Sequence, residues 1–305
     1  MSTRAMGPAT GWSWLARALN LGRGNPKAVI GAIAVVALLA VLPSVMQMIL
    51  QPRLGGQPTA LLTVAGLSTL ASLIVFPLLI GGVLRVIDAV ERGRPASVGG
   101  VFEPFRAGHG AGRLVGFGLL MTALYLLVFG TIVGSFGQDL PEWYMQLVQL
   151  TVDAGGKPVQ PDDIPAPPPG LGMVMALGLL FGLFLGGAYA IGFGQVALGG
   201  RGVLAAIGDG LAGALKNLLP IVVMSALAIV ALLALTLVVT LVGGVLMLVG
   251  GLVHPALGAL LVAPVYLGMI LLMYVVMFGV MYHMWRDICA EPVAPPPLPD
   301  HLVEL

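Results

Sequence analysis

The chain has 305 residues, of which 58% are hydrophobic and 9% are charged, and its formal net charge is +1. Soluble domains carry about 25% charged residues, so a chain this apolar cannot cover itself with polar surface in water, and an ordinary soluble protein is excluded. The basic residues are dispersed, which predicts no nucleic-acid partner, and the single cysteine, Cys289, excludes an intrachain disulfide and a thiolate metal cage.

Six apolar runs without charge are long enough to cross a bilayer, because a spanning helix needs roughly 20 apolar residues. The runs are much longer than barrel strands and lack their alternation, so the sequence predicts an all-α, polytopic membrane helix bundle with about six transmembrane helices. The membrane domain is expected over 28–285, with spans at 28–50, 60–84, 114–136, 171–196, 219–241 and 262–284. The Gly-rich connection 242–261 either stays at the membrane surface or belongs to a span.

Short segments with one apolar face precede the first, third and fifth spans. Their apolar residues recur at helical spacing, and each segment is too short or too polar to span, so three cytoplasmic interfacial amphipathic helices are expected, the first within the N-terminal segment 1–27. The apolar stripes are Trp12/Leu15/Ala16/Leu19, Val98/Val101/Phe102/Phe105 and Val203/Ile207/Leu211/Leu215/Leu218. The order of surface helix, span and span therefore occurs three times. It indicates either an internal repeat or only the three connections that any six-span protein has.

The distribution of basic residues predicts the orientation in the membrane. Twelve of the fourteen Lys and Arg residues lie before the first span, after the sixth, or in the connections after the second and fourth spans. Only Arg53 and Lys157 lie on the other side, where the extracytoplasmic loop 137–170 is acidic and its stretch 157–170 is rich in proline. By the positive-inside rule, both termini are expected in the cytoplasm, and the Pro-rich tail 286–305 with them.

No Asp, Glu, Lys or Arg lies inside the predicted spans. Ion-coupled transporters, voltage sensors and intramembrane metalloproteases need ionisable residues at depth, so these classes are disfavoured. The four histidines are too dispersed to form a metal set, and no nucleophile–base pair is apparent, so the sequence predicts no enzyme, no metal and no cofactor. One ladder at i, i+4 spacing favours apolar packing, with Cu(I) binding as the alternative. Its members are Met269, Met273, Met277 and Met281.

Two spans carry glycines spaced four residues apart. Glycine removes side-chain bulk, so helix backbones can approach closely. These positions are expected to pack helices within the bundle or against a helix of another membrane protein. They are Gly130 and Gly134 in the third span and Gly178, Gly182 and Gly186 in the fourth.

Five arginines surround the second amphipathic segment. A basic residue near anionic lipid contributes about 1 kcal/mol, so this cluster is a candidate site for lipid headgroups or for an acidic partner. The alternative is that these residues only enforce the topology. They are Arg85, Arg92, Arg94, Arg106 and Arg113.

The segment GQVALGGRGVLAAIGDGLAGALKNLLPIVV (194–223) ends one span, forms an amphipathic helix and opens the next span at Lys216–Pro220. Matching features elsewhere are Gly93-Arg94-Pro95, Phe102, Phe105, Tyr282 and Arg286-Asp287-Ile288. With these features the chain resembles an uncharacterised family of proteobacterial six-helix inner-membrane proteins, distantly similar to YciC-like proteins and to the glycerophosphodiester-phosphodiesterase membrane domain. The resemblance covers nearly the whole chain and implies a fold and a compartment. The catalytic barrel of those phosphodiesterases has no counterpart in the chain.

Two functions remain open. The first is a non-catalytic inner-membrane protein that acts as an accessory, assembly or lipid-organising component of the cell envelope, with membrane lipids and another membrane protein as its partners. The second is a permease or channel for a neutral or lipid-like substrate. A continuous polar cavity that reaches the bilayer midplane would favour transport. Such a pathway would use uncharged polar residues such as Gln47, Ser68, Ser72, Tyr125, Tyr189 and Gln195.

Overall fold

The computed structural model describes residues 3–54, 58–154 and 159–289, and every regular element in these ranges is a helix. Six of the helices are long and apolar enough to cross a membrane, so the chain is a multi-pass membrane protein and the predicted fold class is confirmed. They are α2 (Pro26–Leu54), α3 (Pro58–Glu91), α4 (Ala111–Phe136), α6 (Leu171–Ala197), α8 (Leu218–Gly251) and α9 (Pro255–Cys289). Most of the predicted tail 286–305 lies outside the described residues.

The last two helices are longer than the sequence pattern indicates. The connection 242–261, for which the sequence left both the membrane surface and a span open, is helical on both sides of a three-residue turn at 252–254. Its glycines bring the two helices together, because a Cβ on Gly250 would lie 2.5 Å from Gly258 Cα. Glycine therefore serves close helix packing at the end of the hairpin, and the apolar helix continues through it.

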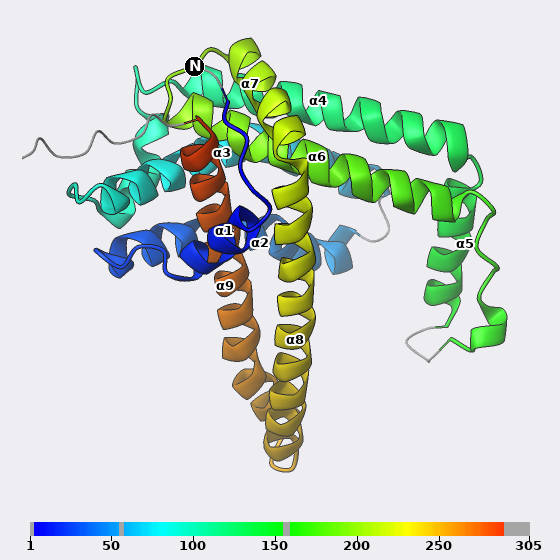
Figure 1. Ribbon diagram of the computed structural model, residues 1–305. Coiled ribbons are helices and arrows are strands. Elements are labelled where there is room, and N and C mark those ends of the chain that lie inside the picture. Colours follow the sequence, from blue (N-terminus) through cyan, green and yellow to red (C-terminus); the bar gives the residue numbers. More distant parts are fainter. Residues whose placement is uncertain (1–2, 55–57, 155–158, 290–305) are drawn as a thin grey trace, which may run out of the picture.

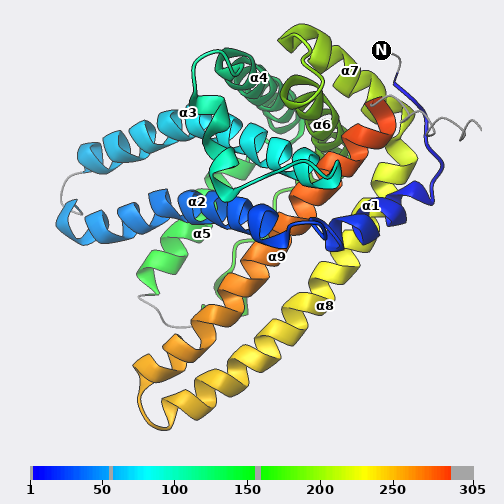
Figure 2. The same ribbon diagram turned by 90° about the vertical axis from the view of Figure 1, so that its left-hand side faces the viewer.

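The long helices form three antiparallel hairpins, α2–α3, α4–α6 and α8–α9, which diverge from a common end (Figures 1 and 2). We call this common end the hub. It consists of the short helices α1 (Thr10–Leu19), η1 (Val98–Phe105) and α7 (Val203–Lys216) together with the adjoining ends of the six long helices. The rest of each hairpin is called an arm.

The three units form a closed ring. The short helix η1 packs against the hairpin that precedes it, α2–α3, and α7 packs likewise against α4–α6. Helix α1 has no preceding hairpin in the chain and packs against the last one, α8–α9, which closes the ring. The second helices of the hairpins, α3, α6 and α9, also contact one another. The three sequential units are therefore arranged as a cyclic repeat in space.

A glycine marks each crossing of a short helix over a hairpin. A Cβ on Gly82 would overlap the backbone of Val101 in η1. A Cβ on Gly192 would lie 2.8 Å from the Ala206 carbonyl oxygen in α7, and one on Gly279 would lie 2.7 Å from Ala18 Cβ in α1. Backbone and small side chains thus meet at all three crossings, which only a residue without a side chain permits.

Each hairpin is also pinned to the segment that follows it in the ring. The Asn25 amide at the start of α2 donates to the Ala96 carbonyl (3.2 Å), and the Arg113 guanidinium in α4 donates to the Gly200 carbonyl (2.7 Å). For the third hairpin, the Asn217 amide donates to the Arg4 carbonyl (2.9 Å). The Arg4 backbone N–H donates to the Ile288 carbonyl near the end of α9 (3.0 Å). The N-terminal segment therefore occupies the position that the connecting segment after the hairpin occupies in the other two units.

The short helix α7 buries small residues and exposes large ones. Helix α7 lays Ala206, Gly210 and Gly213 against α6, whereas Leu204 and Leu215 are 77% and 68% exposed. In water the large residues would be expected inside. In a bilayer, large apolar side chains are as stable facing lipid as they are inside the protein. Small residues on the inner side then permit close contact between helices. The predicted stripes therefore describe the exposed apolar face at least as much as the packed one.

The loop 137–170 contains a helix that the sequence analysis did not predict. Helix α5 (Leu140–Asp153) runs across the far end of the α4–α6 arm (Figure 1). The chain then returns through the short 3₁₀ turn η2 (Pro161–Asp163). Of the predicted Pro-rich stretch 157–170, residues 157 and 158 lie outside the described part of the structure.

Candidate functional site: the charged hub

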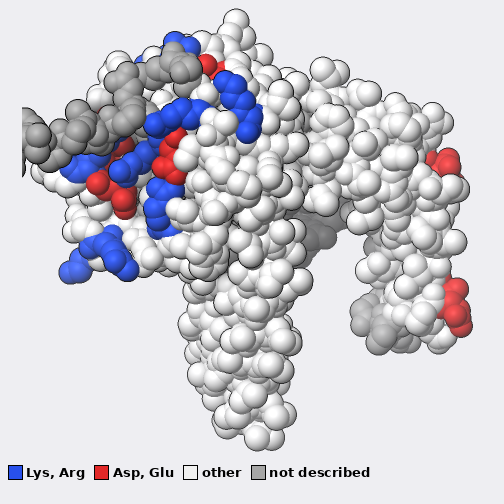
Figure 3. Space-filling view, viewed as in Figure 1, with Lys and Arg blue, Asp and Glu red and all other residues white. Residues whose placement is uncertain are grey.

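The charged side chains of the described residues gather at the hub. Figure 3 shows basic and acidic groups together over the hub, whereas the arms are uncharged on this face except for acidic groups at the far end of the α4–α6 arm. Buried polar side chains are also concentrated at the hub. They are Asp88, Gln195, Asn217 and His283.

Asp88 is the centre of one polar cluster. Its carboxylate accepts hydrogen bonds from Arg92 Nε (2.7 Å), Arg94 Nη2 (2.5 Å) and the Tyr282 hydroxyl (3.3 Å). The hydrogen bond to Asp88 raises the pKa of Arg92, so this guanidinium stays charged. Asp88 is nearly buried, whereas Arg92 and Arg94 are 54% and 58% exposed. Because two guanidiniums share one carboxylate, the cluster keeps one positive charge at the surface.

Arg85 has a different role. Its guanidinium donates to Glu103 (3.3 Å), to the His109 carbonyl (2.8 Å) and to the Ala197 carbonyl (3.3 Å), and only 19% of its side chain is exposed. These acceptors belong to η1, to the connection after it and to α6. Arg85 therefore joins three elements of the hub and has little capacity left for a ligand.

A polar hollow of about 520 Å³ lies between these two clusters, at the hub ends of α3 and α6. Of the five predicted arginines, only Arg85 and Arg94 line it, together with Asp88 and Glu103. Arg92 reaches the same carboxylate from outside. The side chain of Arg106 is exposed and makes no hydrogen bond or ion pair with the described residues.

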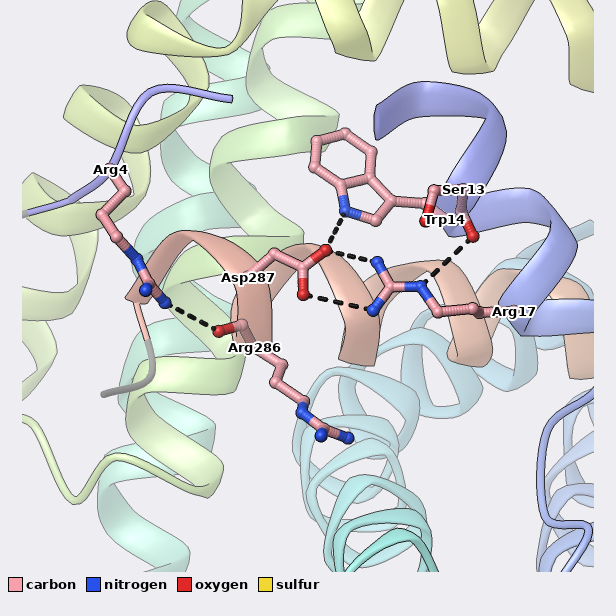
Figure 4. A network of polar contacts seen from close by, with 6 residues as sticks. All are labelled: Arg4, Ser13, Trp14, Arg17, Arg286 and Asp287. Carbon is pink, nitrogen blue, oxygen red and sulfur yellow. Dashed lines mark hydrogen bonds and ion pairs between the residues drawn. The ribbon is translucent and has the colours of Figure 1, made fainter. Parts of the chain in front are cut away.

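A second carboxylate fastens the N-terminal helix to the last one. Asp287 accepts a hydrogen bond from Trp14 Nε1 (2.9 Å) and pairs through both oxygens with Arg17 (Figure 4). The Arg17 Nε also donates to the Ser13 carbonyl (3.3 Å), and Arg4 donates to the Arg286 carbonyl (3.4 Å). The sequence analysis did not single out this cluster. The adjacent pair Arg286-Asp287 was its only signal, and the partners lie more than 250 residues away.

Gln195 belongs to a third cluster. Its amide donates to Asp209 (2.8 Å) and accepts from Trp285 Nε1 (3.3 Å), and Asp209 also pairs with Arg201 (3.1 Å). The side chain of Gln195 is buried. Both of these side-chain hydrogen bonds connect α6 with another helix, one with α7 and one with α9. Gln195 therefore stabilises the hub.

The uncharged polar residues of the arms do not form one route. The Ser72 hydroxyl donates to the Ser68 carbonyl of its own helix (2.8 Å), and both serines line a hollow between α2 and α3. Tyr189 instead lines a groove on the other side of the hub, between α6, α8 and α9. The side chain of Gln47 lies outside the described residues. Tyr189 and the two serines therefore line separate hollows.

The groove between α6, α8 and α9 has a volume of about 490 Å³ and is almost wholly apolar. Its wall includes Gly182 and Gly186 from α6 and Met273, Met277 and Met281 from the methionine ladder. Apart from the methionine sulfurs, its polar contributions come from Tyr189 and Ser225. Met281 is buried, whereas Met273 and Met277 stay exposed along the groove, so the ladder lines an apolar surface and is only partly packed.

The predicted helix-packing glycines fall into two classes. Gly130 and Gly134 have open space where a Cβ would stand. Gly178, Gly182 and Gly186 face Phe129 and Tyr125 of α4, and a Cβ on each would meet them at 3.7 to 3.8 Å, an ordinary contact distance. The closest helix contacts use other glycines, those of the hub. The comparisons with known proteins add no further constraint, since no protein family, curated protein or solved structure matches the chain.

Proposed function

We propose that the protein is a non-catalytic component of a bacterial inner membrane that organises lipid or supports the assembly of envelope proteins, with its hub and both termini in the cytoplasm. The observation that carries the proposal is the separation of charge. Charged side chains of the described residues lie at the hub, apart from acidic groups at the far end of the α4–α6 arm, whereas the lengths of the arms expose apolar side chains and diverge from one another. Lipid or helices of another membrane protein must fill the space between diverging apolar arms.

The exposed arginines of the hub are the proposed contact with anionic headgroups or with an acidic partner. Arg92 and Arg94 share one carboxylate and keep a surplus positive charge, and Arg106 makes no ion pair with the described residues. Basic residues at the cytoplasmic surface attract anionic lipid. Arg85 and Arg113 are proposed to act only in the structure of the hub, because each bonds carbonyl groups of neighbouring elements.

The test is lipid selection by the purified full chain in bilayer nanodiscs that contain phosphatidylglycerol and phosphatidylethanolamine. Replacing Arg92, Arg94 and Arg106 by Gln should lower the enrichment of phosphatidylglycerol around the protein at least severalfold, since each basic residue contributes about 1 kcal/mol. A second version adds Asp88→Asn, because removal of both partners would otherwise leave a buried carboxylate uncompensated. Arg23→Gln with Lys27→Gln is a control at exposed basic sites elsewhere. Unchanged enrichment in both test variants would overturn the headgroup role.

The apolar groove favours the second candidate function, a permease or channel for a neutral or lipid-like substrate. A groove of about 490 Å³ has the size of a small-molecule site and would accept an apolar chain. In proteoliposomes, this function requires that the protein speeds the transfer of a fluorescent lipid analogue between leaflets. It also requires that Ala228→Phe, which enlarges a side chain on the wall of the groove, abolishes the transfer while Gly134→Leu does not. Transfer at the protein-free rate would exclude it for such lipids.

A further inference from the structure

Helix α5 carries one polar and one apolar face along its whole length. Its polar positions, Glu142, Gln146, Gln149 and Asp153, recur at intervals of three or four residues and so share a face. The opposite side carries apolar and aromatic residues at the same spacing. They include Trp143, Tyr144, Leu147, Val148 and Leu150. Such a pattern normally places the apolar face against another element.

The apolar face of α5 is covered only in part. Leu140, Trp143, Leu147 and Leu150 are half-buried, whereas Val148 is exposed and Tyr144 and Met145 are 62% and 63% exposed. A side-chain hydrogen bond joins the helix to the rest of the loop, from Trp143 Nε1 to the Pro165 carbonyl (3.0 Å). An exposed apolar face of this extent is costly in water, at about 25 cal/mol for each Å².

The position of α5 identifies what covers this face. The helix begins four residues after the end of α4 and runs across the far end of the α4–α6 arm (Figure 1). A helix that crosses the tip of a membrane-spanning hairpin lies along the membrane surface. The arm itself exposes apolar side chains such as Leu126, Leu127 and Leu179 to lipid. The apolar face of α5 therefore continues the lipid-facing surface of the arm.

The charges on α5 agree with a lipid surface and decide its orientation. Glu142 and Asp153 lie on the polar face, and the helix has no Lys or Arg. Acidic groups are repelled by anionic lipid and costly to bury, so they remain in water when the apolar face enters the interface. The attachment is then hydrophobic and, unlike that proposed for the hub arginines, needs no anionic headgroup.

We propose that α5 is an in-plane membrane-binding helix that inserts its Tyr144/Leu147/Val148 face into the lipid interface at the end of the α4–α6 arm. Aromatic residues at this level anchor spanning helices and help to set their depth and tilt. The helix thus holds the far end of the arm at the membrane surface opposite the hub.

The test uses the full chain in proteoliposomes, with Cys289→Ala as background and single cysteines that carry a nitroxide spin label. Labels at Tyr144, Leu147 and Val148 should collide severalfold more often with oxygen, which concentrates in lipid, than with a water-soluble nickel chelate. Labels at Glu142, Gln146 and Gln149 should show the reverse, so that accessibility alternates with the period of a helix. High nickel accessibility on both faces would overturn the proposal, and so would protection of the apolar face from both reagents, which indicates a protein partner.

Salt and lipid composition provide a second readout that is independent of the hub arginines. The accessibility pattern of α5 should be the same with or without phosphatidylglycerol and at low or high salt, because the contact is apolar. Leu147→Glu should raise nickel accessibility at Tyr144, whereas Gln146→Glu on the polar face should leave it unchanged. A pattern that is lost at high salt, or that ignores Leu147→Glu, would overturn the proposal even where the hub arginines bind lipid as proposed.

Discussion

At the scale of single residues, buried amides connect segments that are distant in the sequence. The Asn217 side chain is fully buried, donates to the Arg4 and Gly213 carbonyls and accepts from the Met6 backbone N–H (2.7 Å). One amide therefore satisfies three backbone groups at the point where the N-terminal segment closes the ring. A buried backbone group left without a partner costs about 1–3 kcal/mol.

Asn217→Ala should accordingly lower the stability of the hub by about 1–3 kcal/mol, because it removes the acceptor of the Met6 N–H and the hydrogen bond to the Arg4 carbonyl. Thermal unfolding of the purified protein in detergent measures the change. Asn20→Ala is the matched control, since the Asn20 amide donates to the Ala16 carbonyl and accepts from the Arg23 guanidinium at an exposed site within one segment of the chain. Equal melting temperatures for the two variants would contradict the proposed closure.

Glycine positions separate into tolerant and intolerant ones by the space at the missing Cβ. A Cβ on Gly82 has no room at the η1 crossing, whereas one on Gly130 or Gly134 meets nothing within 4 Å. The spacing of glycines in the sequence does not distinguish these cases. Only the close approach of a second backbone does.

Gly82→Ala and Gly192→Ala should each cost about 1–3 kcal/mol or more, because the added methyl group forces helices apart. Gly130→Ala and Gly134→Ala should be neutral or stabilising by up to about 1 kcal/mol, since alanine is the better helix former. Fluorescence-detected size exclusion after heating ranks the four variants. Strong destabilisation by Gly134→Ala would instead show that a partner helix packs there.

At the scale of elements, helix α1 is held on α9 by the Asp287 cluster and by burial of Trp14. If Asp287 is removed, its two hydrogen-bond donors, Arg17 and Trp14, differ in whether water can replace the lost acceptor. Arg17 is partly exposed and can turn to water, whereas the Trp14 indole N–H would stay buried without an acceptor. The carboxylate should therefore matter more than the guanidinium.

Asp287→Ala is expected to destabilise the protein more than Arg17→Ala does, with the double variant less destabilised than the sum of both. The coupling should be about 1 kcal/mol, as for a pair with partial exposure. A double-mutant cycle on unfolding in detergent gives all three values. Equal effects of the two single substitutions would indicate that the Trp14 hydrogen bond contributes nothing.

At the scale of the whole molecule, the ring predicts that the chain can be opened at another point. Each unit has two spans, so a cyclic shift by one unit keeps both termini on the same side of the membrane. The N-terminal segment already contacts the end of α9. A permuted chain that starts at Ser97, runs to Leu305 and continues from Met1 to Ala96 should insert and fold with nearly native thermal stability. A permutant cut inside α3 at Leu79 is the control that should fail, and failure of both would contradict the cyclic repeat.

Helix length makes a second prediction for the whole molecule. With 34 and 35 residues, α8 and α9 are about 51–53 Å long. The hydrocarbon core is about 30 Å thick, so this apolar hairpin must tilt or thicken the bilayer around it. Polarised infrared spectroscopy of oriented proteoliposomes should show a low average helix order that rises as the lipid chains are lengthened. A high order that is independent of lipid length would contradict the divergence of the arms.

The sequence by itself determined the helical class, the six apolar helices and most of their ends to within a few residues, because a lipid environment requires long apolar helices whose backbone bonds are local. It also located the short helices. The predicted C-terminal end of α3, residue 84, is seven residues before its actual end at Glu91. Arg85 and Asp88 interrupt the apolar run, but they form ion pairs within the hub and the helix continues through them. The helix α5 was missed because no apolar run of spanning length marks it.

Only the tertiary structure decided which faces pack, that Asp88 meets Tyr282 and Asp287 meets Trp14, that the groove is apolar, and that three hairpins diverge from a closed ring. These features depend on contacts between residues far apart in the chain. Local spacing fixes the period of a helix, but the close approach of another backbone decides which of its faces is buried.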